Sequence, residues 1–136
     1  MLAFNKFNLA ELPELSAAQY GSRPALSMVV GSVYTYRDFE RLSRGIAQAL
    51  SAYGVKKGDR VALLAENSPH WVIAWFGIVR AGAIVVPILN DFMPKQIANI
   101  IQHSGAKIVF ASNKLQAKLV EISPEPEIWD VSKDFE

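Results

Sequence analysis

The segment that most constrains the fold of this 136-residue chain is a long apolar run, "PHWVIAWFGIVRAGAIVVPIL", which extends from Pro69 to Leu89. A membrane-spanning helix needs about 20 mostly apolar residues, so the run is long enough to form one. Arg80 argues against a span, because a charge near its centre costs roughly 2.5–3.5 kcal/mol on the insertion scale. We therefore expect a helix over residues 69–81, a break at Gly82 and a buried strand over residues 83–88.

Patterns on either side of this run predict further helices and strands. Thr35 begins a helix with Asp38 three residues later, a variant of the capping box, and Gly54 stands where such helices end. The other expected elements are a β-hairpin over 24–36, strands over 61–66, 106–112 and 128–131, a helix from Pro94 to Gly105 and a last helix over 114–122. This order predicts an α/β fold, a parallel sheet with helices on both faces plus an N-terminal β-hairpin.

Composition narrows the classes of function. The formal net charge is +1 and the basic residues are scattered, so we expect no nucleic-acid partner. Cysteine is absent, which excludes disulfides, thiolate zinc sites and a cysteine nucleophile, and agrees with a reducing compartment. The first residues lack the continuous apolar core of a signal peptide, and we expect a cytoplasmic location.

The loops after the strands are where a parallel sheet binds ligands, so functional residues are expected there first. These loops cover Glu66 to Ser68, Asn90 to Met93, and Ser112 to Lys114. No G-x-G pair occurs in the chain. Gly77 and Gly82 have the spacing of a phosphate loop, but Ala83 stands where its lysine would be needed. We expect helix-end geometry at Gly82 and close helix-to-sheet packing at Gly77.

The two histidines are the obvious candidates for a general base. His70 is expected in the first turn of one helix and His103 in the last turn of another, which are ordinary positions for histidine. Ser104 follows His103 directly, and adjacent side chains diverge on a helix, so the two form no nucleophile and base pair. We predict no catalytic, cofactor-binding or metal-binding residue in this chain.

Two further groups of residues have both a functional and a structural interpretation. Asn67, Asn90 and Asp91 lie at predicted strand ends and could touch a ligand, but turn and cap chemistry is the more frequent reason for such residues there. Trp71 and Trp75 could line an acyl pocket, although core packing is the commoner use of an i, i+4 aromatic pair.

The residues placed above resemble the N-terminal part of the AMP-forming acyl-CoA synthetases and their adenylating relatives. The matching elements, in chain order, are Thr35-Tyr36, Gly54-Val55, Lys57 to Val61, Asn67-Ser68, Arg80 to Ala83, Val86-Pro87 and Ser104 to Lys107. The resemblance covers Arg23 to about Ser112. The segment "AIVVPILNDFMP" is closer to the fatty-acid or long-chain CoA ligases than to peptide-synthetase adenylation domains.

The resemblance implies an enzyme that activates a carboxylic acid, with a fatty acid favoured, through an acyl-adenylate to an acyl-CoA thioester. It implies ATP, Mg²⁺ and coenzyme A as cofactors of the full-length enzyme, whose phosphate loop and catalytic lysines lie downstream in the family. We therefore expect the chain by itself to be a structural, inactive N-terminal fragment that binds none of these groups. The resemblance leaves open peripheral membrane contact and homodimerisation.

Three interpretations remain at this level. The first is the ligase fragment, divided into a lead segment 1–22, an α/β subdomain 23–120, which is a partial N-terminal subdomain of an acyl-adenylating enzyme, and an acidic, loosely ordered connecting tail 121–136. The second is a standalone α/β interaction or dimerisation module that uses an exposed sheet edge. The third is membrane insertion of residues 69–89, which Arg80 disfavours.

Overall fold

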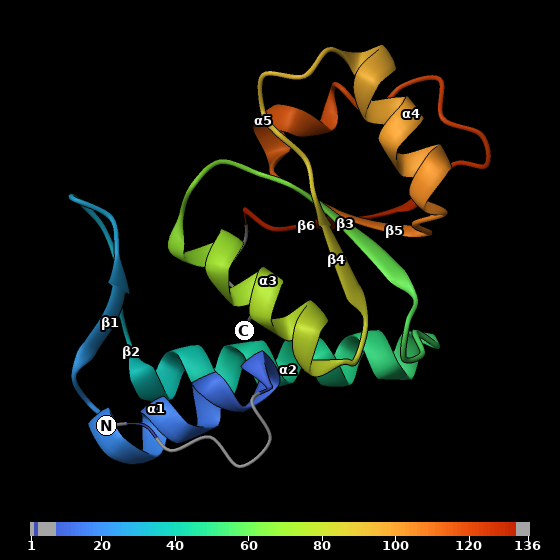
Figure 1. Cartoon of the computed structure of the whole chain (residues 1–136). Coiled ribbons are helices and arrows are strands. Elements are labelled where there is room, and N and C mark those ends of the chain that lie inside the picture. Colours follow the sequence, from blue (N-terminus) through green and yellow to red (C-terminus); the bar gives the residue numbers. More distant parts are fainter. Residues whose placement is uncertain (1, 3–7, 133–136) are drawn as a thin grey trace.

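A four-stranded parallel sheet forms the centre of the protein, as a computed structural model of residue 2 and residues 8–132 shows (Figure 1). The chain contributes the 3₁₀ helix η1 (Leu9–Glu11), the helices α1 (Leu12–Tyr20), α2 (Tyr36–Tyr53), α3 (Pro69–Arg80), α4 (Pro94–Ser104) and α5 (Asn113–Gln116), and the strands β1 (Pro24–Ser27), β2 (Val33–Thr35), β3 (Arg60–Leu64), β4 (Ile84–Pro87), β5 (Ile108–Ala111) and β6 (Glu127–Asp130). The strand order in the sheet is β4-β3-β5-β6, and each neighbouring pair is parallel. Strands β1 and β2 form a separate antiparallel hairpin. The predicted α/β class is confirmed.

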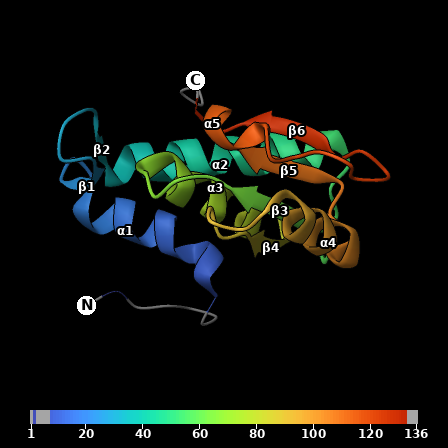
Figure 2. The same cartoon turned by 90° about the horizontal axis from the view of Figure 1, so that it is seen from above.

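The two central strands are buried on both faces, so each face of the sheet needs a cover of its own. On one face Val61 and Leu63 of β3 pack with α2 and α3, through residues such as Ile46 and Ile73. On the other face the alternate residues Ala62 and Leu64 pack with the side chains that α4 and α5 supply. Figure 1 shows α4 and α5 above the sheet and α2 and α3 below it, and Figure 2 shows the same layers seen from above. Helices on both faces were expected from the continuous apolar strands.

Helices α2 and α3 approach each other closely because Gly77 has no side chain. A Cβ atom added there would lie 2.4 Å from Cγ2 of Ile46 on α2. The prediction of close packing at Gly77 is right, but its partner is wrong, since Gly77 faces a helix and not the sheet. Gly82 has a φ of 78° after the end of α3, which confirms the predicted helix-end geometry.

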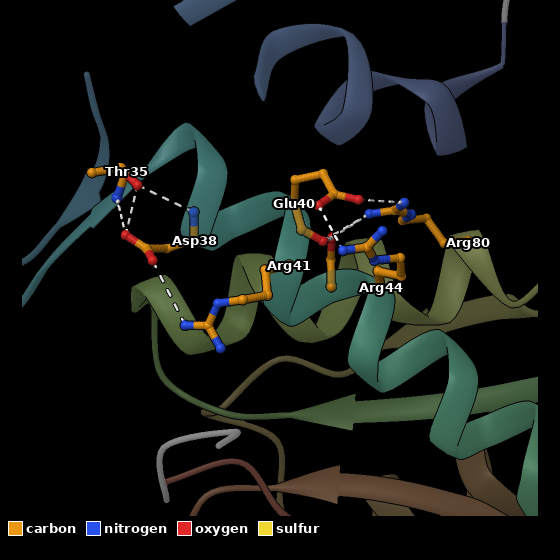
Figure 3. A network of polar contacts seen from close by, with 7 residues as sticks. Thr35, Asp38, Glu40, Arg41, Arg44 and Arg80 are labelled. Carbon is orange, nitrogen blue, oxygen red and sulfur yellow. Dashed lines mark hydrogen bonds and ion pairs between the residues drawn. The ribbon is translucent and has the colours of Figure 1, made fainter. Parts of the chain in front are cut away.

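Arg80 is the one charge in the apolar run, and a partner on α2 neutralises it. Its guanidinium donates to the Oε1 atom of Glu40 at 3.1 Å and to the backbone oxygen of Glu40 at 2.9 Å (Figure 3). A third bond, of 3.0 Å, reaches the Ser43 hydroxyl, which is buried. The Arg80 and Glu40 side chains are only 12% and 15% exposed, so the ion pair lies largely out of water.

The apolar run is not one rod. It forms α3 and then β4, with Ser68 as the N-cap whose side chain accepts from the backbone N–H of Trp71. The bounds of the predicted helix and strand are therefore confirmed to within a few residues. The predicted burial of the strand is wrong, because β4 lies at the end of the sheet and Ile84 is 53% exposed. None of the helices in the described part of the chain is both long enough and apolar enough to cross a bilayer.

The start of α2 and the hairpin follow the sequence closely. Thr35 and Asp38 form a reciprocal capping box, with the Asp38 backbone N–H donating to Thr35 Oγ1 at 3.1 Å. The hydrogen bonds from Thr35 hold the pKa of the Asp38 carboxyl below its ordinary value. Gly54 ends the helix with a φ of 102°.

Three features near the ends of the chain differ from the expectation or were missed. The last predicted helix, 114–122, is wrong in length, because α5 ends at Gln116 and Glu121 has a left-handed φ of 56°. The tail is not loosely ordered over residues 127–130, which form the expected strand as β6 of the sheet. Helix α1 lies in the segment for which no structure was predicted, and it packs on α2.

Replacement of Gly77 by alanine should destabilise the fold by about 1–3 kcal/mol, because the new methyl group overlaps Ile46. Gly45 on the same pair of helices is the matched control, since a Cβ atom there meets nothing within 4 Å. Gly45→Ala should stabilise by about 0.5–1 kcal/mol. Urea unfolding of both variants measures the difference, and equal effects would contradict the close packing.

Glu40→Gln should destabilise the protein by about 3 kcal/mol, because it leaves Arg80 without its counter-charge in a largely buried position. The double variant Glu40→Leu with Arg80→Met should recover much of this loss, since it removes both charges. Arg44→Ala is the control, because that side chain is 56% exposed and its pair with Glu40 is worth less than about 1 kcal/mol. A double variant as unstable as Glu40→Gln would argue against this explanation.

Candidate functional site

The general rule for open parallel sheets directs attention to the carboxyl ends of strands β3 and β5. These strands are neighbours, with Leu64 opposite Ala111. The chain leaves β3 toward α3 on one face and leaves β5 toward α5 on the other face. In open α/β sheets, a crevice between two such diverging loops is the usual ligand position. We call the ends of β3 and β5, with residues 65–68 and 112–114, the switch-point edge.

Two of the three loops that follow the strands of the sheet meet at the switch-point edge. Glu66 follows β3 and Lys114 lies on α5, and their carboxylate and ammonium groups are 3.9 Å apart. The backbone N–H of Ser112 donates to the backbone oxygen of Leu64 at 3.1 Å, which fixes the loop after β5. The Ser112 hydroxyl is buried and makes no hydrogen bond of standard geometry, although it lies close enough to Glu66 to affect its ionisation.

The Glu66 carboxylate is stabilised in its charged form. The Ser112 hydroxyl is the largest cause that lowers its pKa, with Lys114 a smaller one, and partial burial acts in the opposite direction. Because the pKa is lowered on folding, this group stabilises the fold at a pH above its unfolded pKa, and that contribution is lost as the pH falls through the lower pKa of the folded state. Glu66 is thus a charged hydrogen-bond acceptor at neutral pH.

The third predicted loop, residues 90–93 after β4, lies on the other side of β3 in the sheet order. The Lys118 ammonium holds this loop by donating to the backbone oxygens of Asn90, at 2.5 Å, and Phe92, at 3.2 Å. Asn90 therefore contributes its backbone to a loop anchor. Lys118 was not singled out in the sequence, since nothing in its spacing predicts a contact across 28 residues.

The histidines lie far apart in the fold. His70, in the first turn of α3, has its Nε2 atom 2.9 Å from the Tyr34 hydroxyl on β2, and so connects the hairpin to α3. His103 is exposed in the last turn of α4. The hydroxyl of Ser104 donates to the backbone oxygen of Ile101 at 3.0 Å and thus belongs to the helix end.

The remaining candidates are placed as follows. Trp71 and Trp75 are partly buried and pack against the core beneath α3, which agrees with the packing interpretation. Asn67 and Asp91 are exposed on their loops, within the region where the switch-point edge and the loop after β4 meet solvent.

The glycines with phosphate-loop spacing form no phosphate loop in the described residues. Gly77 is packed inside a helix pair and Gly82 ends that helix, so the glycines with phosphate-loop spacing form no loop. At the carboxyl ends of the strands, Lys114 is paired with Glu66 and Lys118 with two carbonyl oxygens. The glycine spacing thus has a structural cause, and these two lysines make contacts within the chain.

Comparison with known proteins places this fold in a family. The family of AMP-binding enzymes matches residues 13–134. That match covers most of the chain, and the chain belongs to this family.

Curated relatives and solved structures agree with this assignment. A long-chain-fatty-acid CoA ligase of Escherichia coli is 41% identical over 108 residues, which are 78% of this chain and 19% of the relative. The chain thus spans about a fifth of the length of such relatives. A fatty acyl CoA synthetase of Mycobacterium tuberculosis superposes with a TM-score of 0.81 at 25% identity, over 90% of this chain and 26% of that one. The nonribosomal peptide synthetase FmoA3 gives a TM-score of 0.85 at 26% identity, over 95% of this chain and 14% of that one.

Ser112→Ala should raise the pKa of Glu66 toward its ordinary value, because the hydroxyl is the main group that favours the carboxylate. Lys114→Met should raise the pKa of Glu66 less than Ser112→Ala does. The Lys114 side chain is 81% exposed, whereas Ser112 is buried, so water and salt screen the effect of the ammonium group. Carbon-detected NMR titration of the Glu66 carboxyl measures both shifts. An unchanged titration in Ser112→Ala would contradict the arrangement at the switch-point edge.

Proposed function

We propose that this chain is the N-terminal layer of an ATP-dependent acid–CoA ligase, which forms an acyl-adenylate and then an acyl-CoA thioester. In this proposal the full-length enzyme uses ATP, Mg²⁺ and coenzyme A, takes a fatty acid as its favoured substrate, and works in the cytoplasm. The part described above supplies the sheet and its helices, while the groups that contact the reacting atoms belong to other parts of the enzyme.

The observation that carries the proposal is the match of residues 13–134 to the AMP-binding enzymes. The relatives named as fatty-acid CoA ligases support the acid class. Acyl transfer through an adenylate needs preorganised cationic groups around the phosphates. Near the carboxyl ends of the strands, Lys118 instead holds the loop after β4 and Lys114 lies 3.9 Å from Glu66.

The boundaries 1–22, 23–120 and 121–136 stay part of the proposal. Helix α1 packs on α2, and β6 pairs with β5. We therefore propose that residues 12–20 of the lead segment and residues 127–130 of the tail fold together with the subdomain between them.

The 136-residue chain should form no acyl-adenylate from ATP, Mg²⁺ and a fatty acid, and these ligands should leave its melting temperature unchanged. The measurements are ATP–pyrophosphate exchange and a thermal-shift titration, with the complete Escherichia coli ligase as the positive control.

Adenylate formation by the chain alone would show that its role is catalytic and would overturn the structural part of the proposal. The coding sequence after Glu136 tests the other part. A reading frame that continues into a glycine-rich phosphate loop supports a ligase, whereas a stop codon directly after Glu136 favours the standalone interaction module.

A further inference from the structure

The tip of the β1–β2 hairpin is the most exposed apolar surface among residues 8–132. Val29 and Val30 are 103% and 89% exposed, and Met28 and Val33 are more than half exposed. Figure 1 shows the hairpin standing away from the main sheet. We call Met28 to Val33 the hairpin tip. Valine side chains that stay in water add no hydrophobic stabilisation to the folded chain. A cluster of them at the surface therefore needs another explanation.

The apolar surface continues from the hairpin tip toward α3. A groove of about 260 Å³ is lined by Leu26, Ser27 and Met28 on the hairpin and by residues 67–69 and Val72 on the other side. No charged residue occurs between Arg23 and Arg37. The tip and this groove therefore form one uncharged surface along the side of the hairpin.

The base of the hairpin is fixed, so the tip is presented in a defined place. The Tyr36 backbone N–H donates to the Arg23 oxygen and the Arg37 N–H to the Gly21 oxygen, each at 3.1 Å. The contact between Tyr34 and His70 connects β2 to α3. An isolated two-stranded hairpin is marginal in water, and these contacts hold it against the helices.

We propose that the hairpin tip is a docking surface for the part of the ligase that lies outside the segment matched here, so that the tip is buried in the complete enzyme. This inference rests on the proposed function. The matched segment is 19% of the Escherichia coli ligase, so about four fifths of such an enzyme must pack against surfaces of this subdomain. Burial of the hairpin tip would remove its most exposed apolar side chains, Val29 and Val30, from water.

Size and chemistry favour this occupant over two others. A stable interface between two copies buries about 800 Å² on each partner, which is more than the few small side chains of the tip and its groove supply. A contact within one chain needs less area because its effective concentration is high. Membrane-surface segments combine aromatic or leucine side chains with lysine and arginine, whereas residues 28–33 contain none of these.

The test compares the isolated chain with a complete ligase in which this chain replaces the matched segment of the Escherichia coli enzyme. Val29→Asp should leave the melting temperature of the isolated chain unchanged, because the side chain is in water, and should lower that of the complete ligase by several degrees. Val120→Asp, at an apolar position outside the hairpin that is 46% exposed, is the control and should have little effect in either protein.

A second measurement, the rate of Met28 oxidation, reports whether the hairpin tip is buried and needs no substitution. Peroxide should oxidise Met28 in the isolated chain about as fast as the exposed Met93, and roughly fivefold more slowly in the complete ligase, because burial limits access to the sulfur. If the hybrid ligase fails to fold, the same rates are measured after the ligase lacking its matched segment is added in trans. Peptide mass spectrometry gives both rates.

Unchanged melting in the complete ligase together with unprotected Met28 would overturn the proposal. So would loss of self-association or of vesicle binding by the isolated chain on Val29→Asp, since these outcomes assign the tip to a second copy or to a lipid surface. Neither readout depends on catalysis, so a complete ligase that protects Met28 but makes no acyl-adenylate would count against the proposed function alone.

Discussion

Burial of strands β3 and β5 on both faces is the constraint on which the rest of the structure depends. Residues of β3 alternate between two separate cores, Val61 and Leu63 on one side and Ala62 and Leu64 on the other. A strand of this kind cannot lie at a solvent-facing surface, so the chain must return to each face with a helix. The alternation of helices and strands, and the divergence of the loops at the switch-point edge, follow from that requirement.

The interface between α2 and α3 depends on particular residues more than on apolar character alone. Gly77 allows the two helices to approach each other. One turn further along α3, the Arg80 guanidinium donates hydrogen bonds to the Glu40 carboxylate and the Ser43 hydroxyl. A charge in an otherwise apolar segment thereby becomes part of helix packing. This ion pair explains how residues 69–89, which are long enough to span a membrane, can instead lie within a layered α/β fold.

Local signals in the sequence predicted most of the fold. Helices with strong apolar periodicity and clear ends, such as α2 between Thr35 and Gly54, were predicted within a residue or two. The last helix was predicted too long because its apolar spacing continues past Gln116, while Leu119 and Ile122 instead turn onto the core beneath α4. Helix α1 was missed, because its weakly amphipathic sequence gives little periodic signal.

The candidate site was predictable only in part. The loops at the carboxyl ends of the strands follow from the α/β pattern, and Glu66, Asn90 and Ser112 lie on them. Which loops meet depends on strand order, and strand order is set by long-range pairing that no local pattern encodes. The contacts of Glu66 with Lys114, of Lys118 with the loop after β4, and of His70 with Tyr34 are all of this kind.

The central claim is that the apolar run is a helix followed by an edge strand within a sheet whose buried strands are β3 and β5. Backbone NMR of the chain without detergent tests it most directly, through chemical shifts over residues 69–89 and amide hydrogen exchange. We expect helical shifts over 69–80, extended shifts over 84–87, and the slowest exchange in β3 and β5. Helical shifts that continue without a break to Leu89 would contradict the account.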